Sequence, residues 1–152
     1  MTRILFVCLG NICRSPMAEF VMKELVKEKG LEKEFTIASA ATCSDELGNP
    51  VYPPVRKLLQ QRGISCEGKT ARRICKEDYD RYDYIVGMDQ NNLRSMLRQF
   101  GGDPEGKISL LMDHTGDNRD VADPWYTRDF HATETDVDRG CAALLEKILS
   151  SK

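Results

Sequence analysis

The first apolar run of the chain leads directly into a cysteine-bearing loop and a helix start. Residues 4–7 read Ile-Leu-Phe-Val, a continuous apolar run that is typical of a parallel strand covered on both faces. Cys8 comes next, and Arg14 lies six positions further on. Ser15 then offers an N-cap hydroxyl, and Pro16 suits the first helical position. The pattern therefore predicts a strand, a short loop and a helix N-terminus in immediate succession.

Strand and helix patterns alternate along the rest of the chain. Further strands are predicted at 35–38, 84–88 and 108–112, and helices at 16–29, 53–62, 90–100 and 137–149. A polar loop is expected over residues 113–133. Strands separated by helices of this length predict right-handed crossovers and a parallel sheet, which binds ligands at the carboxyl ends of its strands. With no linker and no repeat, residues 1–152 are expected to form one α/β domain.

Composition narrows the class of protein. The chain has 152 residues, of which 41% are hydrophobic and 30% charged, an ordinary globular balance. A net charge of −2 argues against nucleic-acid or anionic-membrane partners. No signal-peptide pattern and no apolar stretch long enough to span a bilayer is found. The six cysteines include no Cys-x-x-Cys or Cys/His cluster, so we expect reduced thiols, a cytoplasmic protein and no metal site.

The loop that begins at Cys8 has the chemistry of an oxyanion site built around a thiol. Loop N–H groups and the positive end of a helix dipole converge there, and the field that holds a phosphate also favours a thiolate. Gly10 is expected to adopt backbone angles closed to other residues, and Asn11 to hold the loop rigid. Arg14 offers a planar fork for two oxygens, while Ser15 can donate its hydroxyl to the sulfur. The alternative is a buried cysteine and a solvated arginine.

Residues 7–19, Val-Cys-Leu-Gly-Asn-Ile-Cys-Arg-Ser-Pro-Met-Ala-Glu, resemble the signature of the low-molecular-weight protein tyrosine phosphatases. Ser39-Ala40, 84–89 and 123–126 match that family in the same order. The resemblance implies a four-stranded parallel sheet with helices on both faces, in a flavodoxin-like topology. It also implies hydrolysis of phosphotyrosine in protein substrates, without metal or cofactor, through a cysteinyl-phosphate formed on Cys8 in a monomer or weak dimer. Phosphate or other oxyanions are expected to bind Arg14 and the loop residues Leu9, Gly10, Asn11, Ile12, Cys13 and Ser15.

A carboxylic acid is needed to protonate the leaving ester oxygen. Asp123 is the candidate, because it lies in the matching segment and because Pro124 pushes it toward extended geometry. On spacing alone, an Asp-Pro turn would be the simpler interpretation. Asp120 is the competitor, although a loop-stabilising role suits it better. Trp125 and Tyr126 are predicted to wall a deep slot that admits an aryl phosphate; packing on the core is the alternative for Trp125.

The chain departs from the family pattern around this slot. Ala41 replaces a glycine, while Asp45 and Glu46 stand where relatives often show an aromatic residue and a histidine. This acidic rim would favour basic or neutral residues beside the target tyrosine. Lys69 stands where relatives often carry a histidine that supports the loop through Asn11, so this support is in question. Leu47 is predicted to add some apolar wall.

Two loop residues bear on specificity and redox behaviour. Ile12 favours phosphotyrosine, because related bacterial enzymes that act on phosphoarginine carry a smaller threonine there. Cys13 lies five residues from Cys8, and the resemblance implies a reversible disulfide between them under peroxide. A small apolar filler is the alternative for Cys13. The remaining cysteines are expected to be structural, and both histidines to lie solvated on loops; these residues are Cys43, Cys66, Cys75, Cys141, His114 and His131.

Three rival functions remain. A protein-arginine phosphatase or an arsenate reductase would use the same scaffold, but the latter needs two further cysteines near residues 87–90, where none occurs. A non-catalytic phospho-binding module is the rival from another class. Such a module should lack the nucleophile or the acid, yet Cys8 and Asp123 are both present.

Overall fold

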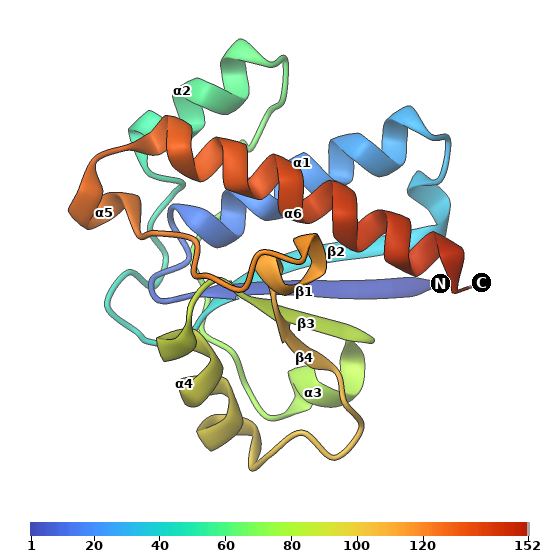
Figure 1. The fold of residues 1–152 in the computed structure, drawn as a ribbon. Coiled ribbons are helices and arrows are strands. Elements are labelled where there is room, and N and C mark those ends of the chain that lie inside the picture. The colour runs from blue at the N-terminus through green and yellow to red at the C-terminus, as the bar shows by residue number, and fades with distance from the viewer. Residues whose placement is uncertain (152) are drawn as a thin grey trace.

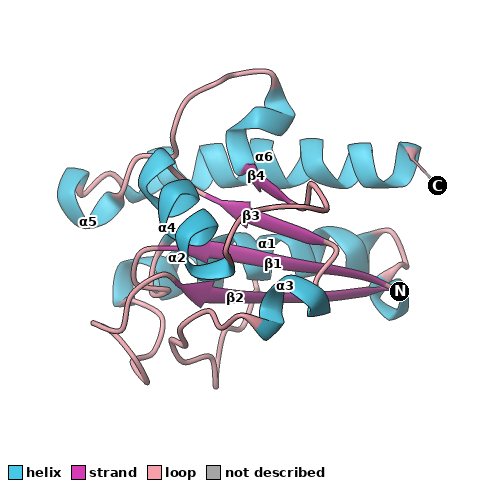
Figure 2. Cartoon of the chain, turned by 90° about the horizontal axis from the view of Figure 1, so that it is seen from below, coloured by secondary structure: helices cyan, strands magenta, loops and turns pink. Residues whose placement is uncertain are grey.

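A four-stranded parallel sheet forms the centre of the computed structural model, which describes residues 1–151. The strand order is β2-β1-β3-β4, seen side by side in Figure 2. In register, Ile4 of β1 pairs with Ile37 of β2 and with Tyr84 of β3. The predicted parallel α/β fold is therefore confirmed. The strands are β1 (Thr2–Cys8), β2 (Phe35–Ala41), β3 (Tyr84–Gly87) and β4 (Ile108–Leu110).

Helices cover both faces of the sheet. In Figure 1, α1 and α6 lie across the upper face with α2 beside them, whereas α3 and α4 lie below. Three short helical segments, η1, η2 and α5, complete the fold. The bounds are α1 (Arg14–Glu28), η1 (Glu32–Glu34), α2 (Pro53–Gln61), α3 (Glu77–Arg81), α4 (Gln90–Phe100), η2 (Leu111–Thr115), α5 (Pro124–Thr127) and α6 (Phe130–Ser150).

The position of β1 inside the sheet, with a core on each face, explains its continuous apolar run. Ile4 and Phe6 belong to the core under α1 and α6, while Leu5 and Val7 belong to the core under α3 and α4. All four side chains are completely buried, and burial of each contributes roughly 1.5–3 kcal/mol. Because alternate strand residues point to opposite faces, a strand covered on both faces has no polar position.

Several element boundaries differ from the sequence prediction. The strand predicted at 35–38 continues to Ala41, because it pairs with β1 as far as Cys8. The first helix begins at Arg14, so Ser15 is already helical and does not cap it. The short helix α3 was not predicted, since five residues carry too little periodicity to detect.

The predicted polar loop 113–133 is wrong in extent. It contains most of η2, all of α5 and the start of α6. Asp129 begins α6 early by accepting a hydrogen bond from the Ala132 N–H at 3.0 Å. Further along α6, Gly140 permits close packing, because a Cβ there would overlap the Leu111 side chain. Within residues 1–151, no helix has the length and apolar character needed to cross a membrane.

The sheet order places Cys8 where a ligand would be expected. Cys8 ends β1, and the chain from β1 crosses to β2 on one side, whereas β3 pairs on the other. In parallel sheets, ligands bind in the crevice at the carboxyl ends of strands where the winding direction changes. The loop after Cys8 lies at this position.

Candidate active site

A hollow of about 160 Å³ lies at the carboxyl end of β1. It gathers nine residues predicted for the site: Cys8, Leu9, Gly10, Ile12, Cys13, Arg14, Asp123, Trp125 and Tyr126. Cys43, Asp45 and Glu46 complete the lining. The structure thus brings together segments more than 100 residues apart in sequence.

The Cys8 sulfur lies at the centre of a ring of donors. The Ser15 hydroxyl lies 3.0 Å from Cys8 Sγ, and the backbone N–H groups of Asn11 and Ser15 donate to it from 3.3 and 3.4 Å. Cys8 itself is only 3% exposed. Three hydrogen-bonding groups of the loop therefore converge on one buried sulfur.

Asn11 is the buried hub of the loop. Its Nδ2 donates to Ser15 Oγ at 2.8 Å and to Ser39 Oγ at 3.0 Å, while its Oδ1 accepts from the Arg72 N–H at 3.2 Å. Because Ser15 Oγ already accepts from Asn11, its own proton is free to point at Cys8 Sγ. The loop rigidity predicted for Asn11 therefore has a specific set of contacts.

The unusual backbone angle in the loop belongs to Asn11 rather than to Gly10. Asn11 has φ +61°, whereas Gly10 is outside the positive-φ region, so the prediction for Gly10 was wrong. Asparagine tolerates the left-handed region better than most residues, and here its side chain is held at both ends. Gly10 serves close packing instead: a Cβ there would lie 3.3 Å from Glu46 Cγ.

A second layer of polar contacts supports Asn11 through Ser39. Ser39 Oγ donates to Glu19 Oε1 at 2.5 Å, and Lys69 Nζ donates to the Ser39 carbonyl at 2.9 Å. Lys69 Nζ also lies 3.5 Å from Glu19 Oε1, and Lys23 pairs with Glu19 Oε2 at 2.6 Å. Burial lowers the pKa of Lys69 despite the nearby Glu19 carboxylate. Lys69 thus reaches the support layer, but through Ser39 rather than by touching Asn11.

Arg14 is buried and oriented by three acceptors. Its Nη1 donates to Asp89 Oδ2 at 2.7 Å and to the Val121 carbonyl at 2.9 Å, and its Nη2 lies 3.4 Å from Asp123 Oδ2. Burial works to lower the pKa of Arg14, but the Cys8 sulfur and the two carboxylates outweigh it and raise the pKa. Asp89 also caps α4 by accepting from the Asn92 N–H at 2.8 Å. The arginine is therefore anchored to a helix terminus.

Asp123 lines the same hollow from the start of α5. Its φ and ψ of −77° and 112° are the extended geometry that a following proline favours. Its Oδ1 accepts from the Trp125 N–H at 3.0 Å and so caps α5, which leaves Oδ2 toward Arg14. Asp120 instead accepts from the Gln90 N–H at 3.1 Å, a contact that stabilises the loop as predicted.

The rim is exposed and aromatic on one side. Trp125 is 45% exposed and Tyr126 76% exposed, so neither is a core residue. The Trp125 ring packs on Tyr52 at a centroid distance of 5.0 Å, a contact for which the sequence held no signal. Leu47 is exposed and is not among the residues that line the hollow; Asp45 and Glu46 take that place.

The cysteines divide into two groups. Cys13 is buried in the hollow beside Cys8, and burial together with the Cys8 sulfur raises the pKa of Cys13 to about 12. Cys66 and Cys141 are buried as expected of structural residues. Cys43 was expected to be structural but lines the hollow, where its thiol donates to the Leu9 carbonyl at 3.2 Å. Cys75, expected to be structural as well, is exposed.

The two histidines are not on loops, contrary to the prediction. His114 lies in η2, where its Nε2 is 2.9 Å from Ser109 Oγ, and burial lowers its pKa. His131 lies in α6 and is solvent-exposed. Neither lines the hollow. Within residues 1–151, no group of three or more His, Cys, Asp or Glu side chains is arranged to hold a metal ion.

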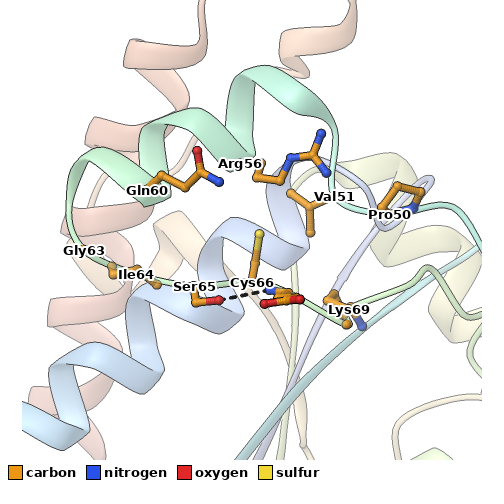
Figure 3. A pocket seen from close by; sticks show the side chains of 11 residues that line it. Pro50, Val51, Arg56, Gln60, Gly63, Ile64, Ser65, Cys66 and Lys69 are labelled. Atoms are coloured by element: carbon orange, nitrogen blue, oxygen red, sulfur yellow. Dashed lines mark hydrogen bonds between the residues drawn. The ribbon is translucent and has the colours of Figure 1, made fainter.

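A larger hollow, of about 410 Å³, lies between the end of α2 and the segment 64–69. Figure 3 shows Arg56 and Gln60 above it and Ser65, Cys66 and Lys69 below. It includes none of the residues predicted for the site. Lys69 connects its wall to the support layer behind Asn11.

Comparison with known proteins now identifies the class. A model of the family described as low molecular weight phosphotyrosine protein phosphatase matches residues 3–152. The chain therefore belongs to this family. It is 39% identical over 154 residues to the low molecular weight protein-tyrosine-phosphatase YfkJ of Bacillus subtilis, covering 100% of this chain and 99% of the relative.

Solved structures agree with this assignment. The crystal structure of YfkJ from Bacillus subtilis superposes with a TM-score of 0.97 and covers 100% of this chain and 97% of the other. A Drosophila arginine phosphatase is 31% identical, with a TM-score of 0.87 and coverage of 97% and 98%. Similar proteins with this fold therefore include phosphatases named for different phosphorylated residues.

Proposed function

We propose that this protein hydrolyses phosphotyrosine in proteins through a phosphocysteine intermediate on Cys8. One observation carries the proposal: a buried sulfur, an anchored arginine and a carboxylate face the same small hollow. Cys8 and Arg14 are buried in its wall, and the Asp123 carboxylate lies 3.4 Å from the Arg14 guanidinium. These are the three groups that attack on phosphorus, charge stabilisation and proton transfer require.

In the first step, the Cys8 thiolate attacks phosphorus in line with the tyrosyl oxygen. The S–P bond forms while the P–O bond to tyrosine breaks, and protonated Asp123 transfers its proton to the leaving oxygen. The Arg14 guanidinium and the loop N–H groups hold the three remaining phosphoryl oxygens as charge develops on them. Asp89 contributes by keeping the guanidinium in place.

In the second step, water attacks phosphorus of the thiophosphate. Asp123, now a carboxylate, takes a proton from that water, and the S–P bond breaks to release inorganic phosphate. The departing sulfur regains its negative charge next to the Ser15 hydroxyl at 3.0 Å. Cys8 and Asp123 therefore serve both steps. Cys8 first attacks phosphorus and then leaves it, and Asp123 first gives a proton and then takes one.

The shape of the hollow favours an aryl phosphate. The sulfur is buried at the base, whereas Trp125 and Tyr126 stand exposed at the mouth, so a flat ring between them carries its phosphate down to Cys8. Ile12 lines the same hollow with an apolar side chain. It offers no polar group to the guanidinium nitrogens of phosphoarginine, which supports phosphotyrosine as the substrate.

Peptide hydrolysis tests this proposal. Phosphate release from a phosphotyrosine peptide should exceed that from a phosphoarginine peptide of the same sequence by at least tenfold. Cys8→Ser should abolish release while orthovanadate or phosphate still binds, because Arg14 and the loop N–H groups remain. Cys66→Ser is the matched control, and it should retain activity. Release by Cys8→Ser at the wild-type rate would remove Cys8 as the nucleophile.

We further propose that Cys13 protects Cys8 from irreversible oxidation. Hydrogen peroxide oxidises the Cys8 thiolate to a sulfenic acid, and the Cys13 thiol then condenses with it to a disulfide and releases water. Both cysteines line one hollow, and a pKa of about 12 keeps Cys13 a thiol at neutral pH. After peroxide, dithiothreitol should restore wild-type activity, whereas Cys13→Ser should recover poorly. Equal recovery would remove this role from Cys13.

The setting of this chemistry is also a proposal. A free Cys8 thiolate is best preserved in a reducing cytoplasm. We propose that residues 1–152 form one phosphatase domain that acts there as a monomer or weak dimer. A tight dimer through the exposed Trp125 and Tyr126 would close the hollow to a protein substrate.

A further inference from the structure

A wide groove of about 820 Å³ opens beside the hollow that contains Cys8. The two spaces share the lining residues Leu9, Arg14, Cys43, Asp123 and Tyr126. From there the groove runs along α4 and the segment 42–44. A substrate polypeptide that places its phosphotyrosine over Cys8 can therefore continue directly into this groove.

Three exposed arginines line this groove and have only neutral partners. Arg73 donates to Gln99 Oε1 at 3.3 Å and to Ser44 Oγ at 3.2 Å. Arg94 donates to Asn91 Oδ1, and Arg98 to Ser95 Oγ at 3.3 Å. Among the residues that the structure describes, none of the three pairs with a carboxylate.

Most other arginines of the chain differ from these three. Arg3, Arg56 and Arg128 have no ion pair among the residues that the structure describes, but the remaining six pair with aspartate or glutamate side chains: Arg14, Arg62, Arg72, Arg81, Arg119 and Arg139. The two carboxylates that line the groove, Asp89 and Asp123, both contact Arg14. The groove therefore has an uncompensated positive charge in a protein whose net charge is −2.

The part of the hollow that the groove does not share is acidic. Asp45 and Glu46 line the hollow there, and Glu46 Oε2 accepts only from Asn49 Nδ2 at 2.6 Å. The predicted preference for basic or neutral residues therefore applies to this part alone. A bound peptide would meet carboxylates there and arginines in the groove.

We infer that the groove binds acidic residues on one side of the phosphotyrosine in the substrate protein. This inference rests on the proposed phosphatase function and deepens it. Arg94 and Arg98 are spaced four residues apart on α4, so their side chains lie on one face roughly 5–6 Å apart. Alternate residues of an extended peptide are about 6.6 Å apart, so two acidic side chains at alternate positions match this pair.

Two phosphotyrosine peptides test the inference. One carries two glutamates at alternate positions on one side of the phosphotyrosine, and its partner carries glutamines; versions for the other side complete the set. At low salt, wild-type kcat/KM should be about tenfold higher for glutamate on one side only. The ratio should fall toward one in 0.5 M NaCl, because salt screens exposed charges.

Substitution then assigns the preference to the groove. In Arg94→Gln/Arg98→Gln, the glutamate-to-glutamine ratio should fall to about two or less. Arg56→Gln, an exposed arginine of the separate hollow in Figure 3, should keep the wild-type ratio. A ratio near one in the wild type, or an unchanged ratio in the double variant, overturns the inference. Failure of the wild type to hydrolyse either these peptides or para-nitrophenyl phosphate would instead overturn the proposed function.

Discussion

The loop that surrounds Cys8 and the rim above it face the same hollow but are built in opposite ways. In the loop, Asn11, Arg14 and Ser15 are each at most 2% exposed, and their polar groups are engaged in hydrogen bonds. In the rim, Trp125 and Tyr126 are exposed, and Trp125 packs only against Tyr52 and the Arg128 guanidinium among the aromatic and cation–π contacts of residues 1–151. A buried polar network tolerates little change, since each lost partner leaves an unsatisfied group. The rim can vary at small cost.

This difference separates chemistry from recognition. The groups proposed to act on phosphorus are held by contacts from four separate segments of the chain. The groups that would meet the rest of the substrate, including Glu46 and Arg94, have few or neutral partners. Asp123 is the exception, because it belongs to the rim by position and to the proposed chemistry by its carboxylate. The following substitutions test this difference between the loop and the rim.

The largest effect is expected at Asp123. Asp123→Asn keeps an oxygen that can accept from the Trp125 N–H but removes the acidic proton. For phenyl phosphate, whose phenolate is a poor leaving group, kcat/KM should fall by about 10²–10⁴. An activated ester with a dinitrophenyl leaving group should lose far less of its kcat/KM, because this constant reports the first step and not the hydrolysis of the shared phosphocysteine. Asp120→Asn is the control, and kcat/KM measured with both esters makes the comparison. Equal losses for both esters would argue against a proton donor.

The next effect concerns the framework behind the loop. Asp78 is completely buried, accepts from Arg72 Nη1 at 3.0 Å and from the Cys75 N–H at 2.8 Å, and so fixes the segment whose Arg72 N–H holds Asn11. Asp78→Asn should lower the free energy of unfolding by about 2 kcal/mol at pH 7. Urea unfolding measures this difference, with the exposed Asp80→Asn as control.

The same substitution has a predictable pH dependence. Burial raises the pKa of Asp78, but the hydrogen bonds from Arg72 and Cys75 outweigh it and hold the pKa below its ordinary value of 3.8. The Asp78 contribution is therefore complete above pH 3.8 and is lost as the pH falls through the lowered pKa of the folded state. The difference in the free energy of unfolding between wild type and Asp78→Asn should be constant from pH 7 to 5 and should shrink below pH 5. A gap that widens in acid would contradict this assignment.

The smallest effect is expected at the outer rim. Tyr126 is 76% exposed, so Tyr126→Ala should raise KM for para-nitrophenyl phosphate about threefold and leave kcat nearly unchanged. Steady-state kinetics separate the two constants. A fall in kcat comparable to that of Asp123→Asn would break the contrast between loop and rim.

Much of this site could be predicted because its parts are local. The strand, the loop and the start of α1 are continuous in sequence, so the surroundings of Cys8 could be anticipated from residues 4–16. Two predictions in this region were wrong. Asn11 rather than Gly10 takes the left-handed conformation, and Ser15 does not cap α1, although its predicted contact with the Cys8 sulfur is present. Both residues have side chains that compete for several roles within a few ångströms.

The rim and the support layer were harder to predict because they depend on contacts between distant segments. Leu47 does not line the hollow, although Cys43 does. Lys69 reaches the loop through Ser39, and Trp125 rests on Tyr52. Arg94 and Arg98 are four residues apart on α4, but no local spacing connects them with Arg73, which comes from the segment after Lys69.

By itself, the sequence determined the parallel α/β class, the position of Cys8 after the first strand and the candidacy of Arg14, whereas Asp123 became a candidate only through the resemblance to the family. Strand burial, helix starts and loop chemistry are short-range properties, so they can be recognised in neighbouring residues. Only the tertiary structure decided which charges are compensated. In the folded chain Arg14 pairs with Asp89, whereas Arg73, Arg94 and Arg98 have only neutral partners. The physical reason is that ion pairing falls off within a few ångströms, and those distances are set by packing between segments far apart in the chain.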